Sequence, residues 1–113
     1  MIARRETLLW AVQRATAVVL AFCVLVHLAT IIYAVRTGLS ASAILGRTQG
    51  SFAWGAFYGV FVIAVAVHAA LGMRVIAAEW LRMKGPVAEI FAAGFAVLLA
   101  AMGLRAVMAV VAA

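Results

Sequence analysis

Residues 48–73 read TQGSFAWGAFYGVFVIAVAVHAALGM, a run of 26 residues without a charged side chain. At about 1.5 Å per residue, a helix of this length crosses the roughly 30 Å apolar layer of a bilayer. The run contains a histidine, His68, and a polar imidazole in hydrocarbon is costly enough to indicate a function. This stretch therefore predicts a membrane-spanning helix that carries a functional side chain.

Two further runs have the same character. Residues 15–35 (ATAVVLAFCVLVHLATIIYAV) are 21 uncharged residues that include His27, and residues 90–113 carry a single charge, Arg105. The chain is 70% hydrophobic with a mean hydropathy of +1.25, whereas a soluble domain is about 45–50% apolar. No run alternates apolar and polar residues as a barrel strand would. We therefore predict an all-α membrane protein, a single domain over 1–113 with three transmembrane helices.

The helix limits follow from capping and turn residues. Thr7 is a plausible N-cap for the first helix, and the Gly-rich polar segment 36–50 joins it to the second, with a short turn of helix over 40–45. Lys84-Gly85-Pro86 is the clearest turn signal, and Pro86 suits the first turn of a helix. The expected helices cover about 8–36, 52–80 and 87–112.

The distribution of Lys and Arg predicts the orientation. One side of the membrane would carry six of these residues and the other side three: Arg4, Arg5, Arg14, Arg74, Arg82 and Lys84 against Arg36, Arg47 and Arg105. The positive-inside bias then predicts a cytoplasmic N-terminus and a periplasmic C-terminus. The expected location is the bacterial inner membrane, with the mitochondrial inner membrane as the alternative.

The net charge of +6 does not point to a nucleic-acid partner, because the nine basic residues are spread over helix ends and form no basic run. Such a distribution suits contact with lipid headgroups. Cys23 is the only cysteine and falls within the first apolar run. We expect it to be a small buried apolar residue.

The two histidines lie at different expected depths. His27 follows Arg14 by 13 residues and His68 precedes Arg74 by six, which places them about 20 Å and about 9 Å from the same membrane boundary. A buried imidazole in such a helix is a natural axial ligand for haem iron. Because of this difference in depth, either each histidine binds the iron of a different haem or only one of them is a haem ligand. In both cases a partner helix would supply the second axial ligand. The alternative is that each imidazole hydrogen-bonds a neighbouring carbonyl.

Residues near His68 fit a haem. In HAALGMRVIAAEW (68–80), Gly72 lies one turn after His68 on the same face and leaves room for a planar ring. Arg74 is placed to pair with a haem propionate, as is Arg14 at the same boundary. The alternative is that Gly72 is a notch for helix packing and Arg74 only sets topology.

A second polar group lies at the start of the first helix, in LWAVQRATA (9–17). Gln13, Arg14 and Thr16 place hydrogen-bonding groups at the membrane edge, with Trp10 at headgroup depth. A quinone headgroup needs donors to its carbonyl oxygens at this depth. The alternative is a helix start with residues that prefer the interface.

These stretches resemble a known family. QRATAVVLAFCVLVHLATIIYAV (13–35) and WGAFYGVFVIAVAVHAALGMRVIAAEW (54–80) are similar to the first two helices of the cytochrome b membrane-anchor subunit of succinate dehydrogenase/fumarate reductase. The second stretch has that family's pattern H-x3-G-[ILM]-R followed by an acidic residue near the helix exit. Here these positions are His68, Gly72, Met73, Arg74 and Glu79.

The resemblance implies a respiratory-chain subunit without dicarboxylate chemistry of its own. His68 would bind the iron of a haem b nearer the inner face, and His27 that of an outer haem, so that one or two haems are shared with a partner. Arg14, Thr16 and Trp10, with Gln13, would line a quinone site. The implied partners are a flavoprotein subunit, an iron–sulfur subunit, and a second membrane anchor or second copy of this chain.

Two other classes of protein are alternatives to this hypothesis. A haem-free structural subunit of a respiratory complex would have the same hydropathy. A proton-coupled multidrug transporter would need a carboxylate inside the membrane, whereas Glu6, Glu79 and Glu89 all lie at expected interfaces. The haem-bearing anchor therefore remains the leading hypothesis.

Overall fold

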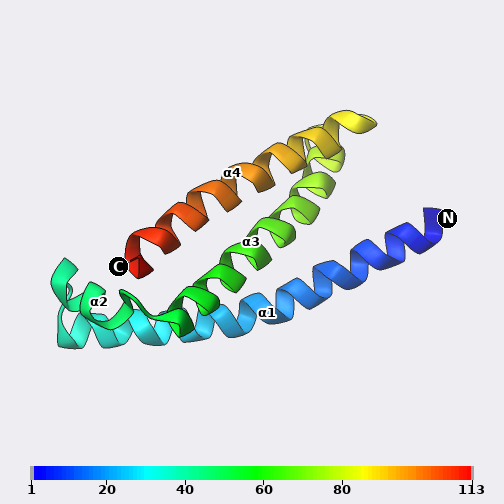
Figure 1. Cartoon of the computed structure of the whole chain (residues 1–113). Coiled ribbons are helices and arrows are strands. Elements are labelled where there is room, and N and C mark those ends of the chain that lie inside the picture. Colours follow the sequence, from blue (N-terminus) through cyan, green and yellow to red (C-terminus); the bar gives the residue numbers. More distant parts are fainter. Residues whose placement is uncertain (1, 113) are drawn as a thin grey trace.

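The computed structural model describes residues 2–112 (Figure 1). Its four helices are α1 (Ile2–Thr37), α2 (Ala41–Thr48), α3 (Phe52–Glu79) and α4 (Pro86–Val111). The helices α1, α3 and α4 are each long and apolar enough to cross a membrane, whereas α2 is short. The prediction of an all-α membrane protein with three spanning helices is confirmed.

Local sequence signals explain most helix starts. Ser40 and Ser51 cap α2 and α3, because their side-chain oxygens accept hydrogen bonds from the backbone N–H groups of Ala43 and Trp54. Pro86 begins α4 after Gly85, whose φ of 59° lies in the left-handed region that favours glycine. The short helix expected over 40–45 is present and extends to Thr48.

The predicted start of the first helix was wrong. The helix α1 begins at Ile2, and Thr7 lies inside it, where the Thr7 hydroxyl donates to the carbonyl of Ala3 at 2.9 Å. Thr7 is therefore not an N-cap. A threonine hydroxyl inside a helix can donate to a carbonyl of the preceding turn, so a threonine alone does not mark a helix start.

The helix α3 lies between α1 and α4 and packs against both (Figure 1). The N-terminus of α1 and the α3–α4 loop lie at one end, which we call the loop end; α2 and the C-terminus of α4 lie at the other, the α2 end. At the α2 end, the Thr48 hydroxyl donates to the Val110 carbonyl at 2.6 Å, and Gly50 N–H donates to the Val111 carbonyl at 2.8 Å. These bonds satisfy carbonyls that a helix C-terminus leaves free.

The interior consists of small side chains, while most large apolar side chains face outward. This is the pattern of a membrane bundle, in which small residues let helix backbones approach one another. Cys23 is only 2% exposed, which confirms the prediction that it is buried. The buried residues are Cys23, Ala64, Ala66, Ala77, Ala88, Ala92 and Val107.

Candidate functional site

One face of α1 carries the polar side chains that meet α3. Four of these polar side chains are half-buried, and with buried Cys23 they follow one another at spacings of three, seven, four and three residues: Gln13, Thr16, Cys23, His27 and Thr30. Such spacing keeps residues on one side of a helix. Both sequence-predicted site regions of α1 therefore contribute to the contact with α3.

His68 meets this face through its Nδ1 atom. The Nδ1 of His68 lies 3.1 Å from Oγ1 of Thr16, and both side chains are half-buried. The Nε2 of His68 makes no hydrogen bond within residues 2–112, and it is not among the enclosed atoms that lack a partner. This nitrogen is therefore without a partner among the described residues and is not fully enclosed by them.

His27 makes an equivalent contact closer to the α2 end. Its Nδ1 lies 3.1 Å from the hydroxyl oxygen of Tyr58 on α3, and the ring of Phe61 meets the imidazole edge at 5.7 Å. Thr30 lies beside this pair, with its hydroxyl 3.5 Å from that of Tyr58. The Nε2 of His27 also has no hydrogen-bond partner among the described residues.

The two contacts keep the histidines at separate levels. Thr16 and His27 are eleven residues apart on α1, and Tyr58 and His68 are ten apart on α3. At the rise of an α-helix, both separations correspond to about 15 Å along the axis. Because each histidine binds the opposite helix at its own level, the two imidazoles do not approach one another.

A cavity of about 1180 Å³ opens beside His27, between α1, α3 and α4 and against α2. Its lining is mostly apolar, and the polar exceptions include His27, Thr30, Tyr58 and Arg47. The guanidinium of Arg47 lies over the ring of Tyr33, 5.1 Å from its centroid. The cavity thus combines apolar walls with the imidazole of His27 and the cationic side chain of Arg47.

At the loop end, Gly72 and Arg74 face α1. A Cβ at Gly72 would lie 3.7 Å from Nε2 of Gln13, so the space in front of this glycine is taken up by the Gln13 side chain. Arg74 donates from Nη2 to Glu6 at 3.4 Å, while its Nε is buried without a partner among the described residues. The Oε1 atom of Gln13 is likewise buried and has no partner in this part of the chain. Buried polar atoms of this kind usually have a partner.

The other predicted residues of α1 lie apart from this contact. Trp10 and Arg14 are exposed, and the Arg14 guanidinium stacks on the Trp10 ring at 5.5 Å. The structure therefore brings Gln13 and Thr16 to the α1–α3 contact with Arg74, Gly72 and His68, but turns Trp10 and Arg14 outward.

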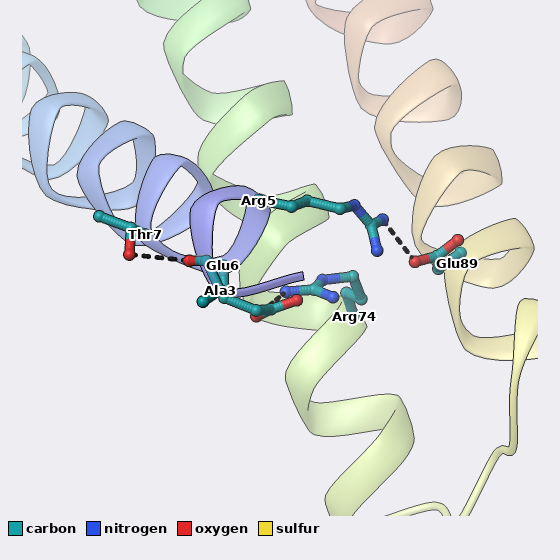
Figure 2. Close-up of polar contacts among 6 residues, drawn as sticks. All are labelled: Ala3, Arg5, Glu6, Thr7, Arg74 and Glu89. Carbon is teal, nitrogen blue, oxygen red and sulfur yellow. Dashed lines mark hydrogen bonds and ion pairs between the residues drawn. The ribbon is translucent and has the colours of Figure 1, made fainter. Parts of the chain in front are cut away.

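Two ion pairs join the N-terminal turns of α1 to the other helices at the loop end. Figure 2 shows Arg5 extended toward Glu89 of α4 and Arg74 of α3 turned toward Glu6. The Arg5–Glu89 distance is 2.7 Å, and both side chains are about half exposed. These pairs place charged groups of three helices at one end of the bundle.

A match to a protein family agrees with this arrangement. Residues 1–111 match the model of the succinate dehydrogenase/fumarate reductase transmembrane subunit. The chain belongs to this family. No curated protein and no solved structure matches it. As a succinate dehydrogenase/fumarate reductase transmembrane subunit, it is part of a membrane complex with a flavoprotein and an iron–sulfur subunit.

Sequence reasoning gave no site role to three residues that the structure places in this transmembrane subunit's candidate site: Tyr58, Thr30 and Arg47. The contact of Tyr58 with His27 could have been found from helix register. If the first two spanning helices are antiparallel and Thr16 faces His68, then residue 58 lies near the level of His27. That register depends on contacts between distant residues, which composition does not reveal.

Proposed function

We propose that this chain is the haem b-bearing anchor of its complex. It would hold the flavoprotein and iron–sulfur subunits at the membrane and pass electrons between them and a quinone. The observation that carries the proposal is the pair of intramembrane imidazoles, each fixed through Nδ1 and each with a free Nε2. An imidazole present only for packing would not need to leave one nitrogen unpaired in an apolar layer.

The residues near His68 fit a haem. The Nε2 of His68 can bind iron, and the Arg74 guanidinium keeps unused donor capacity because its contact to Glu6 is long. Arg74 follows His68 by six residues, about 9 Å along the helix, which suits a propionate at the ring edge. Gly72 would then serve the contact with Gln13 rather than the ring itself.

When bound, haem b accepts and releases one electron at a time. The chain's own residues determine where this happens. His68 would hold the iron, Arg74 and the more distant Arg14 would offset propionate charge, and the apolar helix faces would exclude water. Within residues 2–112 each level has a single imidazole, so a second ligand would come from another membrane subunit or a second copy.

The cavity beside His27 supports a second haem at the α2 end. Its volume, its apolar walls and the free His27 Nε2 suit a large planar ring. Arg47 is the cationic residue that lines this cavity. One or two haems per complex are compatible with the chain, and the number bound depends on the partner.

A quinone site is proposed at the loop end of α1. Trp10 and Arg14 are exposed there and available to a neighbouring subunit, and the Gln13 amide lies one residue away. The Thr16 hydroxyl is a poorer donor to a quinone, because its proton is directed to the backbone carbonyls of Val12 and Gln13. The excess of Lys and Arg supports a cytoplasmic position for this end, in a bacterial inner membrane.

Replacing His68 with leucine in the intact complex tests the haem assignment. We expect loss of the b-type absorbance of one haem from the reduced spectrum, because leucine offers no iron ligand. The amount of haem per flavin, measured as the pyridine haemochrome, should fall by the same share. Thr37→Val is a suitable control, since the Thr37 hydroxyl only donates to its own helix. An unchanged spectrum in His68→Leu would rule out the ligand role.

A further inference from the structure

We infer that Thr16 is a positioning residue for His68: its hydroxyl accepts the Nδ1 proton and so keeps the Nε2 lone pair available to iron. The inference rests on the proposed function and adds a second role at the same site. It reassigns Thr16 from contact with a quinone to support of the imidazole.

The direction of the hydrogen bond follows from the other contacts of Thr16. Its Oγ1 lies 2.9 Å from the Val12 carbonyl oxygen and 3.0 Å from that of Gln13. Carbonyl oxygens only accept, so the single hydroxyl proton points toward them. The remaining contact of Oγ1, 3.1 Å to Nδ1 of His68, must then be one in which Nδ1 donates.

The protonation of the ring follows. A neutral imidazole carries one N–H, so a proton on Nδ1 leaves Nε2 as an unprotonated nitrogen. Both side chains are half-buried within helices long and apolar enough to span a membrane, where water competes little for the bond. The contact therefore selects one tautomer and one ring orientation, and it does so before any iron is bound.

The same arrangement recurs at the level of His27. The Thr30 hydroxyl donates to the His27 carbonyl at 2.7 Å, so at 3.5 Å it is an acceptor for the Tyr58 hydroxyl. The Tyr58 oxygen is then free to accept from Nδ1 of His27 at 3.1 Å. Both imidazoles thus donate Nδ1–H to a hydroxyl on the facing helix, and both keep Nε2 free.

The hydrogen bond from His68 to Thr16 would affect the affinity and the midpoint potential of a haem bound by His68. A ligating imidazole that donates its second N–H is more basic, and this favours ferric over ferrous iron. Loss of such a partner typically weakens metal binding by about 10–100-fold. If the affinity for ferric haem falls tenfold more than the affinity for ferrous haem, the one-electron midpoint potential rises by about 59 mV.

The test is a redox titration of the intact complex with Thr16→Val and Thr16→Ser. Valine has nearly the shape of threonine but no oxygen, so we expect a b-type spectrum that is retained, with a raised midpoint potential and lower haem occupancy. Serine keeps the hydroxyl and should behave as the native protein. Thr37→Val, which removes a hydroxyl far from either histidine, should leave the potential unchanged.

A native potential in Thr16→Val would overturn the inference, and so would an equal shift in Thr16→Ser, which would indicate packing instead of hydrogen bonding. If the valine variant does not assemble, Thr16→Ala and Thr16→Ser give the same comparison, since they differ only by the oxygen. These results are separable from failure of the proposed function, which would appear as a haem spectrum that does not respond to His68→Leu.

Discussion

Threonine hydroxyls on α1 have two roles, depending on what lies opposite them. Thr7 and Thr37 donate to carbonyls of the preceding turn and make no other hydrogen bond within residues 2–112. Thr16 and Thr30 make the same backbone contacts but also meet a side chain of α3. The hydroxyls of Thr16 and Thr30 therefore connect α1 to α3, whereas those of Thr7 and Thr37 bond only within α1.

Tyr58 offers a clean test at this scale. Tyr58→Phe removes one oxygen and leaves Nδ1 of half-buried His27 without its partner, which we expect to lower the free energy of unfolding by about 1–3 kcal/mol. Tyr33→Phe is the control, because the Tyr33 ring keeps its contact with Arg47 without the hydroxyl. Unfolding of both variants in detergent micelles measures the difference. Equal stability would contradict the importance of the His27–Tyr58 bond.

Residue identities alone supplied the candidate site residues but not how their side chains connect. The two histidines were found because imidazoles are rare in apolar runs, and their separate levels were found from distances to the nearest arginines. The pairing of Thr16 with His68 was not found, since it depends on the rotation of α1 about its axis. The same rotation turns Arg14 outward, although it is only two residues from Thr16.

At the scale of elements, α3 and α4 are in close contact at a glycine of α4, Gly103. A Cβ built at Gly103 would lie 2.6 Å from Cγ1 of Val62, a distance that requires something to move. Gly94, also in α4, has open space at the same position. The two glycines therefore have the same backbone role but different surroundings.

This pair predicts a difference in stability. Gly103→Ala should be less stable than Gly94→Ala by about 1–3 kcal/mol, because overpacking affects only the first and the gain in helix propensity is common to both. The measurement is unfolding in detergent, followed by loss of helical circular dichroism. Equal stabilities would mean that Val62 can turn aside without cost.

The elements themselves were largely predictable. Uncharged runs of 21 and 26 residues predicted α1 and α3, and Pro86 marked the start of α4. The first turns of α1 were not predicted, because Arg4, Arg5 and Glu6 give no apolar signal. They are helical here with Arg5 and Glu6 paired to Glu89 and Arg74, contacts that exist only once the helices have assembled.

For the whole molecule, the orientation in the membrane is open to a direct test. Alkaline phosphatase, which is active only outside the cytoplasm, should be inactive when fused after Lys84 in the α3–α4 loop and active when fused after Gly50. The reason is the excess of Lys and Arg at the loop end. The reverse pattern would contradict the predicted cytoplasmic N-terminus and the proposed position of the soluble subunits.

The two hydroxyl–imidazole contacts between α1 and α3 also define the axial position of one helix relative to the other. Sliding one helix along the other by a single residue moves it by about 1.5 Å and would break both contacts together. The two hydrogen bonds therefore favour one axial register of α1 against α3, and with it one spacing of the imidazoles along the bundle. Electron tunnelling falls steeply with distance, so the separation of any carriers bound at these two imidazoles would depend on this register of α1 against α3.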